Sequence, residues 1–299
     1  MARWFVAGAA GMLGHDLCAV LEAAGHTVTR ADLPGLDILD LAQCVEQVAG
    51  HDVVVNSAAY TAVDAAETDE ARAFAVNAVG AANLARAAHG AGAAMVQLST
   101  DYVVAGERRE PYAADAPVAP ATAYGRTKAA GEWAVRAECP RSWVVRTAWL
   151  YGAHGKNFPA TMQRLGGERE RLTVVADQVG QPTWTVDLAE GLVRIVDGGA
   201  PFGIWHATGA GECSWFELAR AVFEELGLDP ERVSPISTDE FPLPAPRPPY
   251  SVLSHDMWAA AGIAPLPHWR DALHRAAPDV LGVAGDPSGQ RRDSRATAE

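Results

Sequence analysis

Gly8-Ala9-Ala10-Gly11-Met12-Leu13-Gly14 separates the first apolar run of the chain, Trp4–Ala7, from the first helix-length stretch, Met12–Ala24. Its glycines permit a tight turn and a close approach of the backbone to a ligand. The helix that follows would present free N–H groups at its N-terminus, where a pyrophosphate binds well. A glycine triplet alone is weak evidence, and a purely structural glycine turn is the alternative. Its position between a strand and a helix favours a dinucleotide-binding site.

The first half of the chain continues this alternation of short apolar runs and amphipathic stretches. The further runs are bounded by small or polar residues and predict buried strands: Val28–Ala31, Val53–Asn56, Met95–Ser99 and Trp143–Arg146. Apolar spacings of three and four predict helices over Leu41–Val48, Glu67–Ala91 and Tyr124–Glu138. The alternation predicts an α/β fold with a doubly wound parallel sheet of the Rossmann type. Ligands of such folds bind beyond the carboxyl ends of the strands.

The second half is less regular and predicts a smaller lobe. Strands are expected at Leu172–Val175 and Ile204–His206, and helices at Val186–Val196 and Ser214–Leu226, the last with Ser214 and Glu217 as a capping box. Five prolines within Phe241–Pro249 predict an extended loop. We therefore expect a dinucleotide-binding domain over residues 1–150. Residues 151–281 would form mainly a substrate-binding lobe, with some segments returning to the first domain, and residues 282–299 a disordered tail.

Composition excludes several classes of function. The chain has 299 residues, 49% of them apolar, and a formal net charge of −13, which would repel nucleic acid and anionic membranes. We expect neither as a partner. The four scattered cysteines predict reduced thiols, and no cluster has metal-ligand spacing. With no signal peptide or membrane span expected, the predicted location is cytoplasmic.

The choice of nicotinamide cofactor depends on two residues near the end of the second strand. Asp32 lies where an acid typically binds the adenosine ribose, which favours NAD. Arg30 is two residues away and could face the 2′-phosphate of NADP. The alternative interpretation is that Asp32 is a solvent-exposed acid in a turn with no role in cofactor binding. The sequence therefore leaves NADPH and NADH both open.

Tyr124-Gly125-Arg126-Thr127-Lys128 places a tyrosine and a lysine on one face of a helix. An ammonium beside a phenol favours the phenolate, so we expect Lys128 to lower the pKa of Tyr124. A tyrosine tuned in this way can give a proton to a carbonyl oxygen as hydride arrives. The chain has only two lysines, Lys128 and Lys156, which makes the pairing unlikely by chance. The alternative is that Tyr124 and Lys128 are a pair of residues on the surface of a helix with no catalytic role.

Ser99-Thr100-Asp101-Tyr102 directly follows the fourth predicted strand. A hydroxyl at that strand end can bind the same carbonyl oxygen as the tyrosine. The alternative is that these hydroxyl residues only mark the transition from the strand to a turn.

The glycine pattern, the hydroxyl after the fourth strand and Tyr-x-x-x-Lys together resemble the extended short-chain dehydrogenase/reductases. Further stretches narrow the resemblance to the dTDP-4-dehydrorhamnose reductase family over about residues 3–280. They are Asn56–Glu67 (NSAAYTAVDAAE), Ser99–Val103 (STDYV), Arg146–Gly152 (RTAWLYG), Asn157-Phe158, Asp177–Thr183 (DQVGQPT) and Arg247-Pro248.

This resemblance implies reduction of the C4 ketone of a dTDP-linked 4-keto-6-deoxysugar by NADPH or NADH. Tyr124 would be the proton donor, Lys128 would hold the nicotinamide ribose, and Thr100 would polarise the ketone. Asp101 and Trp149 would contact the sugar together with Thr100, and Arg247 would contact the nucleotide diphosphate. The cofactor would be bound by Tyr124, Lys128 and a set of loop residues: Gly8, Gly11, Met12, Leu13, Asp32, Asp37, Ile38, Ala59, Tyr60, Thr61 and Leu98.

The chain departs from the family pattern beside the expected sugar site. Val104-Ala105-Gly106 and Pro249-Tyr250 replace the usual residues, and Val252 stands where an arginine is usual. These changes leave the sugar open, including one made for an antibiotic. A nucleotide-sugar epimerase and a non-catalytic regulatory subunit are the alternatives. The family includes magnesium-dependent dimers; a homodimer is therefore an open expectation, but no carboxylate set predicts a metal site here.

Overall fold

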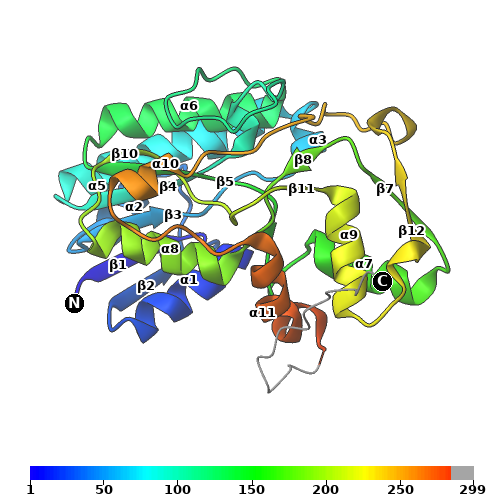
Figure 1. The fold of residues 1–299 in the computed structure, drawn as a ribbon. Helices are drawn as coiled ribbons and strands as arrows, with labels where there is room; N and C mark the ends of the chain where they lie inside the picture. Colours follow the sequence, from blue (N-terminus) through cyan, green and yellow to red (C-terminus); the bar gives the residue numbers. More distant parts are fainter. Residues whose placement is uncertain (284–299) are drawn as a thin grey trace.

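A computed structural model describes residues 1–283 and contains a central six-stranded parallel sheet (Figure 1). The strand order is β10-β5-β4-β3-β1-β2. The strands are β1 (Arg3–Ala7), β2 (Thr27–Ala31), β3 (Val53–Asn56), β4 (Ala94–Thr100), β5 (Ser142–Thr147) and β10 (Gly203–His206). The order reverses between β1 and β3, which is where doubly wound sheets bind their ligands. The predicted fold class is confirmed.

Helices cover both faces of this sheet (Figure 1). One face packs against α1 (Met12–Ala23) and α8 (Thr185–Asp197), and the other against α2 (Leu41–Val48), α5 (Ala81–Gly90) and α6 (Ala123–Glu138). Because both faces are covered, β3, β4 and β5 are buried along their whole length. The continuous apolar runs seen in the sequence follow from this burial.

The predicted helix over Glu67–Ala91 is present from Glu70 to Gly90 without a break, so the structure differs from the prediction at its first turn and in a π-helical stretch. The chain forms α3 (Val63–Ala66), turns at Glu67–Asp69, and then runs through α4 (Glu70–Phe74), a π-helical segment η1 (Ala75–Gly80) and α5. The turn is held because the Glu67 carboxylate accepts a hydrogen bond from the backbone N–H of Ala123 at 2.8 Å. Apolar spacing does not reveal such a side-chain contact from a distant helix.

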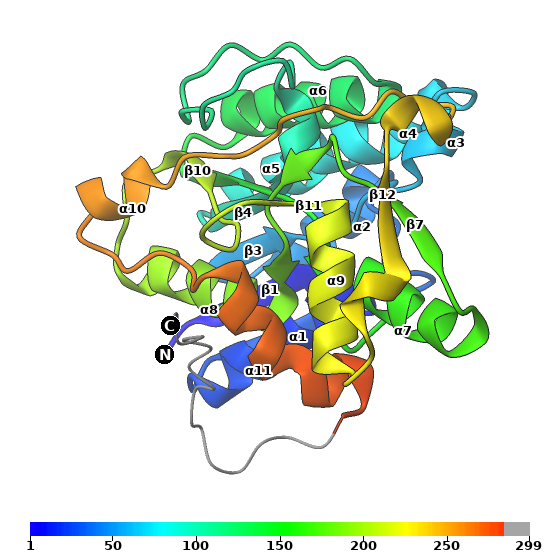
Figure 2. The ribbon, with the colours of Figure 1, turned by 45° about the vertical axis from the view of Figure 1, so that its right-hand side comes forward.

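The second lobe lies beyond the carboxyl ends of the strands (Figure 2). Its core is formed by α7 (Phe158–Glu168), α9 (Trp215–Glu225) and α11 (Trp269–Leu281). Short strand pairs complete it: β6 (Leu150–Tyr151) with β9 (Thr183–Trp184), β7 (Leu172–Val175) with β12 (Val233–Ile236), and β8 (Val179–Gly180) with β11 (Cys213–Ser214). The short helices are η2 (Asp101–Val103), η3 (Pro230–Arg232), η4 (Thr238–Glu240) and α10 (Asp256–Ala260). The Ser214–Glu217 capping box is present at the start of α9.

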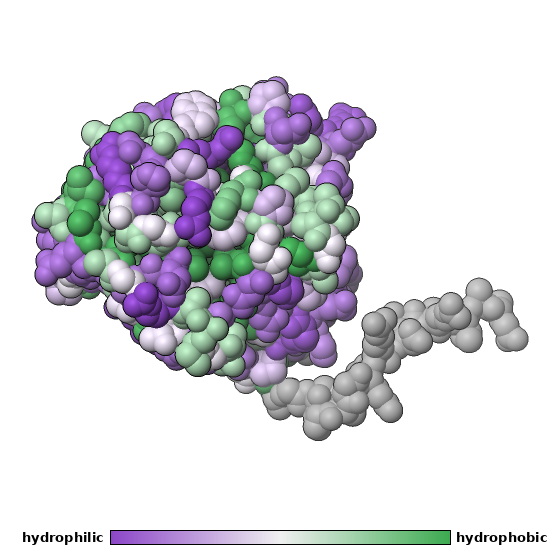
Figure 3. Space-filling model, turned by 90° about the vertical axis from the view of Figure 1, so that its left-hand side faces the viewer, coloured by the Kyte–Doolittle hydropathy of each residue, from purple (hydrophilic) through white to green (hydrophobic). Residues whose placement is uncertain are grey.

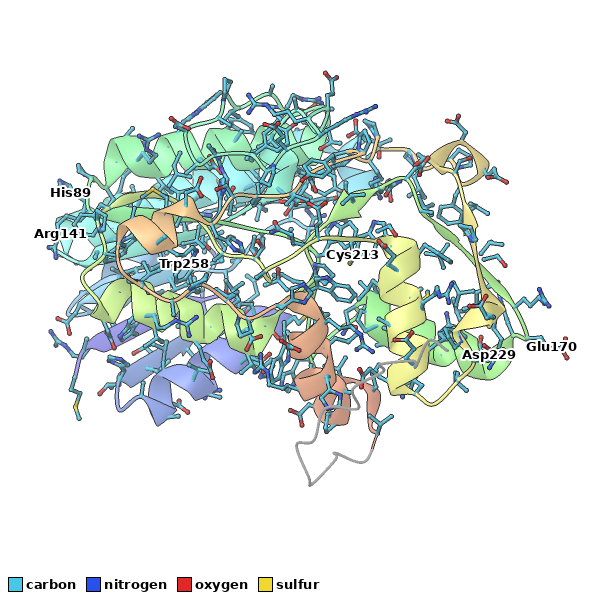
Figure 4. All side chains as sticks on the ribbon, viewed as in Figure 1. His89, Arg141, Glu170, Cys213, Asp229 and Trp258 are labelled. Carbon is cyan, nitrogen blue, oxygen red and sulfur yellow. The ribbon has the colours of Figure 1, made fainter. Side chains whose placement is uncertain are left out.

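Segments of the second half return to the central sheet. The predicted strand at Ile204–His206 becomes edge strand β10, and Trp258 of α10 packs over it, donating through Nε1 to the His206 carbonyl at 2.6 Å (Figure 4). Phe241–Pro249 is extended and irregular, as its prolines predict. The division at residue 150 stays a prediction, and the predicted tail lies outside the described residues apart from Gly282 and Val283.

Within residues 1–283, no helix has both the length and the apolar character needed to cross a bilayer. On the face shown in Figure 3, polar and apolar residues are interspersed. All four cysteines are buried, and none of them forms a disulfide bond.

Candidate active site

The glycine-rich loop is shaped by close contacts that only glycine permits. Gly8 has a φ of +81°, and a Cβ there would lie 2.5 Å from the backbone nitrogen of Ala58. At Gly14, a Cβ would lie 2.2 Å from the Gly8 carbonyl oxygen. Gly11 is the N-cap of α1 and offers no side chain to the N–H groups of Met12 and Leu13. The uncapped helix end and the close backbone packing fit a pyrophosphate.

Asp32 and Arg30 at the end of β2 are both engaged with protein groups. The Asp32 carboxylate accepts hydrogen bonds from the backbone N–H of Ala10 at 2.9 Å and of Leu33 at 2.8 Å. Arg30 donates to both carboxylate oxygens of Glu22 at 2.9 Å. Asp32 therefore stands beside the glycine-rich loop, while the Arg30 guanidinium is directed toward α1.

The remaining predicted cofactor residues follow the carboxyl ends of three strands. Asp37 and Ile38 come after β2, Ala59-Tyr60-Thr61 after β3, and Leu98 lies near the end of β4. The π-helical segment holds the second group, because the Asn77 side chain accepts from the Tyr60 N–H at 2.8 Å and donates to the Tyr60 carbonyl at 3.1 Å. Asn77 also donates to the Thr127 hydroxyl at 3.0 Å, which ties this loop to α6.

Tyr124, Lys128 and Thr100 converge where α6 passes the end of β4. Thr122 caps α6 by accepting from the Gly125 N–H at 2.9 Å, which fixes where the Tyr-x-x-x-Lys turn begins. Burial raises the pKa of Tyr124 to about 12, an effect that its contact with the Thr100 hydroxyl partly offsets. The phenol is therefore protonated at neutral pH and holds a proton to give.

The prediction that Lys128 lowers the pKa of Tyr124 is wrong for this structure. The Lys128 ammonium is buried and donates to the Leu98 carbonyl at 2.7 Å. Burial lowers the pKa of Lys128 to about 8, with the Glu132 carboxylate opposing the shift. The i,i+4 spacing placed both residues on one face of α6, but it could not show that a backbone carbonyl takes up the ammonium.

Asp101 is a buried carboxyl that joins the end of β4 to the second half of the chain. It accepts hydrogen bonds from the Thr100 hydroxyl at 3.0 Å and from the Ser251 hydroxyl at 2.6 Å. Burial raises the pKa of Asp101 to about 6, although both hydroxyl contacts lower it. Ser251 belongs to the segment that departs from the family pattern, so that segment reaches the carboxyl end of β4.

Trp149 lies in an aromatic column. Its φ is +47°, the one positive value at a non-glycine position within residues 1–283. The indole stacks on Trp215 with ring centroids 3.5 Å apart, and Phe158 packs against Trp215 at 4.7 Å. A Cβ at Gly180 would lie 2.5 Å from Trp149 Cε2, so only glycine fits beside the indole.

Arg247 reaches the first half of the chain through an ion pair. Its Nη1 and Nη2 donate to the two carboxylate oxygens of Asp64 on α3, at 2.9 and 2.7 Å. Asp64 also accepts from the Ala245 N–H at 3.1 Å. Arg247 lines a cavity of about 230 Å³ together with Tyr102, Thr122 and Pro248. The guanidinium is thus held in place at the edge of a cavity lined by Tyr102, whose ring lies 5.6 Å from the ring of Tyr124.

Comparisons with known proteins agree with this geometry. A family model described as the RmlD substrate binding domain matches residues 2–281. The chain is 49% identical over 292 residues to the dTDP-4-dehydrorhamnose reductase of Streptomyces griseus, which covers 95% of this chain and 96% of that relative. The chain belongs to the dTDP-4-dehydrorhamnose reductase family. The resemblance predicted from the motifs is confirmed.

Two further members of the family bear on substrate and cofactor. The dTDP-4-keto-6-deoxy-D-glucose reductase of Streptomyces niveus is 48% identical over 279 residues, covering 92% of this chain and 96% of the relative. The structure of the Bacillus anthracis dTDP-4-dehydrorhamnose reductase in complex with NADP has a TM-score of 0.89 at 39% identity. It covers 92% of this chain and 98% of the other.

Sequence reasoning missed five residues that shape this reductase-family site: Asn77, Asp64, Glu132, Trp215 and Ser251. Asp64 lies inside a stretch that carried the resemblance, and Glu132 is one helical turn beyond Lys128. These positions gave a usable signal. Asn77, Trp215 and Ser251 act through contacts between distant segments, and the residues next to them in the sequence do not indicate these contacts. Among the described residues, no three His, Cys, Asp or Glu side chains are grouped to hold a metal.

Proposed function

We propose that this protein reduces the C4 ketone of a dTDP-linked 4-keto-6-deoxysugar with NADPH or NADH. The observation that carries the proposal is the convergence of Thr100, Tyr124 and Lys128 at the same edge of the parallel sheet as the glycine-rich loop. Membership of the reductase family supports the same reaction. The alcohol product requires one hydride and one proton, and the site offers a separate source for each.

When bound, the reduced nicotinamide supplies the hydride. The Tyr124 phenol gives its proton to the ketone oxygen as negative charge develops there, and the Thr100 hydroxyl binds the same oxygen. Lys128 would hold the nicotinamide ribose. Gly8, Gly11 and the N-terminus of α1 would bind the pyrophosphate, with Asp32 at the adenosine ribose.

The direct test follows a deuterium label. The enzyme is incubated with the 4-keto sugar nucleotide and with cofactor carrying deuterium on either face of the nicotinamide C4. We expect one of the two labelled cofactors to place deuterium on the sugar C4 in the purified product. Unlabelled product from both labelled cofactors, or label at another sugar carbon, would contradict a direct ketone reduction.

The lowered pKa of Lys128 predicts how the activity depends on pH. Because its pKa is lowered to about 8, the ammonium is present below that pH and is lost above it. We therefore expect kcat/KM to fall as pH rises through about 8. The profile is measured as kcat/KM for the cofactor at saturating sugar nucleotide, so that it reports the enzyme form that binds the cofactor. A kcat/KM that stays level up to pH 10 would contradict this role.

Substrate contacts are assigned to Thr100, Asp101, Trp149 and Arg247. Arg247 borders a cavity and is held by Asp64, and a guanidinium fixed in this way is suited to a diphosphate. We expect Arg247→Ala to raise KM for the sugar nucleotide about tenfold or more with little change in kcat. An unchanged KM would remove Arg247 from the site. Arg164→Ala, on an exposed ion pair, is the matched control.

The identity of the sugar is the finer part of the proposal. We favour dTDP-4-dehydrorhamnose or a related sugar made for an antibiotic, because the relatives named above are a dTDP-4-dehydrorhamnose reductase and a dTDP-4-keto-6-deoxy-D-glucose reductase, which shows that the sugar varies within the family. Tyr250 and Val252, which depart from the family pattern, adjoin Ser251 at the carboxyl end of β4. We further propose a cytoplasmic location, a homodimer, and a division of labour in which residues 1–150 bind the cofactor and 151–281 mainly the sugar nucleotide.

A further inference from the structure

A buried ion pair lies one helical turn along α6 from Lys128. Glu132 on α6 and Arg146 on β5 are 1% and 0% exposed. Burying two charges costs desolvation energy that a pair of apolar side chains of similar volume would avoid. The pair is therefore poorly explained as a device for stability alone.

The pair holds a third element. Arg146 Nε and Nη2 donate to the two carboxylate oxygens of Glu132, at 2.9 and 2.8 Å. The Ser99 hydroxyl of β4 donates to Glu132 Oε1 at 2.5 Å. A single carboxylate thus joins α6, β5 and the carboxyl end of β4.

Two side chains of α6 hold consecutive residues of β4. Lys128 donates to the Leu98 carbonyl at 2.7 Å, and Glu132 accepts from the hydroxyl of the next residue, Ser99. Thr100 follows directly. The strand end that carries the ketone-binding hydroxyl is therefore fixed against the helix that carries Tyr124 and Lys128.

Glu132 can hold Ser99 without adding an unpaired negative charge near Lys128, because its charge is compensated by a neighbouring cation. Arg146 neutralises the carboxylate through two hydrogen bonds. His206 on β10, paired in register with Arg146, adds no second cation, because burial and the Arg146 charge lower its pKa to about 3. Asp101 bonds to the Ser251 and Thr100 hydroxyls and makes no hydrogen bond to either member of this pair.

We infer that Glu132 is a positioning residue for the ketone reduction, which holds Ser99 and, through it, the Thr100 hydroxyl at the spacing from α6 that proton transfer from Tyr124 requires. This inference rests on the proposed function. Glu132 would touch neither substrate nor cofactor. Its contribution would appear in kcat and not in binding.

Ser99→Ala tests this most cleanly, because it removes one hydroxyl and leaves the Glu132–Arg146 pair intact. We expect kcat to fall about tenfold, with unchanged KM for the sugar nucleotide and unchanged cofactor affinity. Ser142→Ala is the matched control: Ser142 is a buried serine, 3% exposed, at the start of β5. It should keep the kcat of the wild type.

A double variant without the buried ion pair distinguishes a positioning role of Glu132 from a general loss of stability. Glu132→Leu with Arg146→Met removes both buried charges together, and adding Ser99→Ala to it should lower kcat no further. Wild-type kcat in Ser99→Ala would overturn the inference, as would an equal further loss in the charge-free background. A wild-type protein that leaves the 4-keto sugar unreduced would overturn the proposed function and this inference together, whereas the other outcomes bear on the inference alone.

Discussion

Replacing Tyr124 by phenylalanine is expected to lower kcat by about 100-fold or more. The substitution removes the phenolic proton and keeps the ring that packs edge-on against Tyr102. Cofactor affinity should be nearly unchanged, because Lys128 keeps its place on the Leu98 carbonyl. Steady-state turnover and a fluorescence titration of reduced cofactor measure the two effects separately.

Tyr151→Phe is the matched control for Tyr124→Phe. The Tyr151 hydroxyl is buried and has no hydrogen-bond partner among the described residues, so its removal should leave turnover and stability close to the wild type. Turnover of Tyr124→Phe equal to that of Tyr151→Phe would rule out Tyr124 as the proton donor. A loss of cofactor binding in Tyr124→Phe would instead assign the tyrosine to cofactor placement.

Arg146→Met is expected to lower the free energy of unfolding by about 3–5 kcal/mol. It leaves the Glu132 carboxylate buried with the Ser99 hydroxyl as its one remaining side-chain hydrogen-bond partner among the described residues. Adding Glu132→Leu to the same chain should recover most of the loss, because the uncompensated charge is then gone. Urea unfolding followed by circular dichroism measures both variants.

An exposed ion pair provides the comparison for Arg146→Met. Arg164 and Glu168 are 59% and 53% exposed, and Arg164→Met should change the free energy of unfolding by less than about 1 kcal/mol. If Arg146→Met costs no more than Arg164→Met, burial does not govern the energetics of the Glu132–Arg146 pair. A double variant as unstable as Arg146→Met alone would point to lost packing and not to lost charge compensation.

The sequence predicted most of the sheet because its strands are buried on both faces. Runs such as Val53–Asn56 must then be continuously apolar, and the glycine-rich loop marks where the first of them ends. The convergence of Thr100 with Tyr124 and Lys128 was also predictable, since parallel strands bring their carboxyl ends to one edge. Local spacing carries that information.

Contacts between distant segments were not predictable in this way. Asp64 and Arg247 are 183 residues apart, and the pairing occupies the guanidinium expected to face a diphosphate. The break at Glu67 depends on the backbone of Ala123, and the ammonium of Lys128 binds a strand carbonyl that no pattern of side chains reveals. The pKa of Tyr124 was wrongly predicted because burial of the phenol, which raises the pKa, does not follow from the spacing of Tyr124 and Lys128.

The most direct test of the account is oxidation of NADPH or NADH by the purified protein in the presence of a dTDP-4-keto-6-deoxysugar, supplied with and without prior 3,5-epimerisation. We expect the absorbance of the reduced cofactor to fall in step with formation of the 4-hydroxyl product. Dependence on the epimerised sugar would identify dTDP-4-dehydrorhamnose or a sugar derived from it as the substrate. Cofactor that binds but is not oxidised by either form of the sugar would contradict the assignment as a ketoreductase.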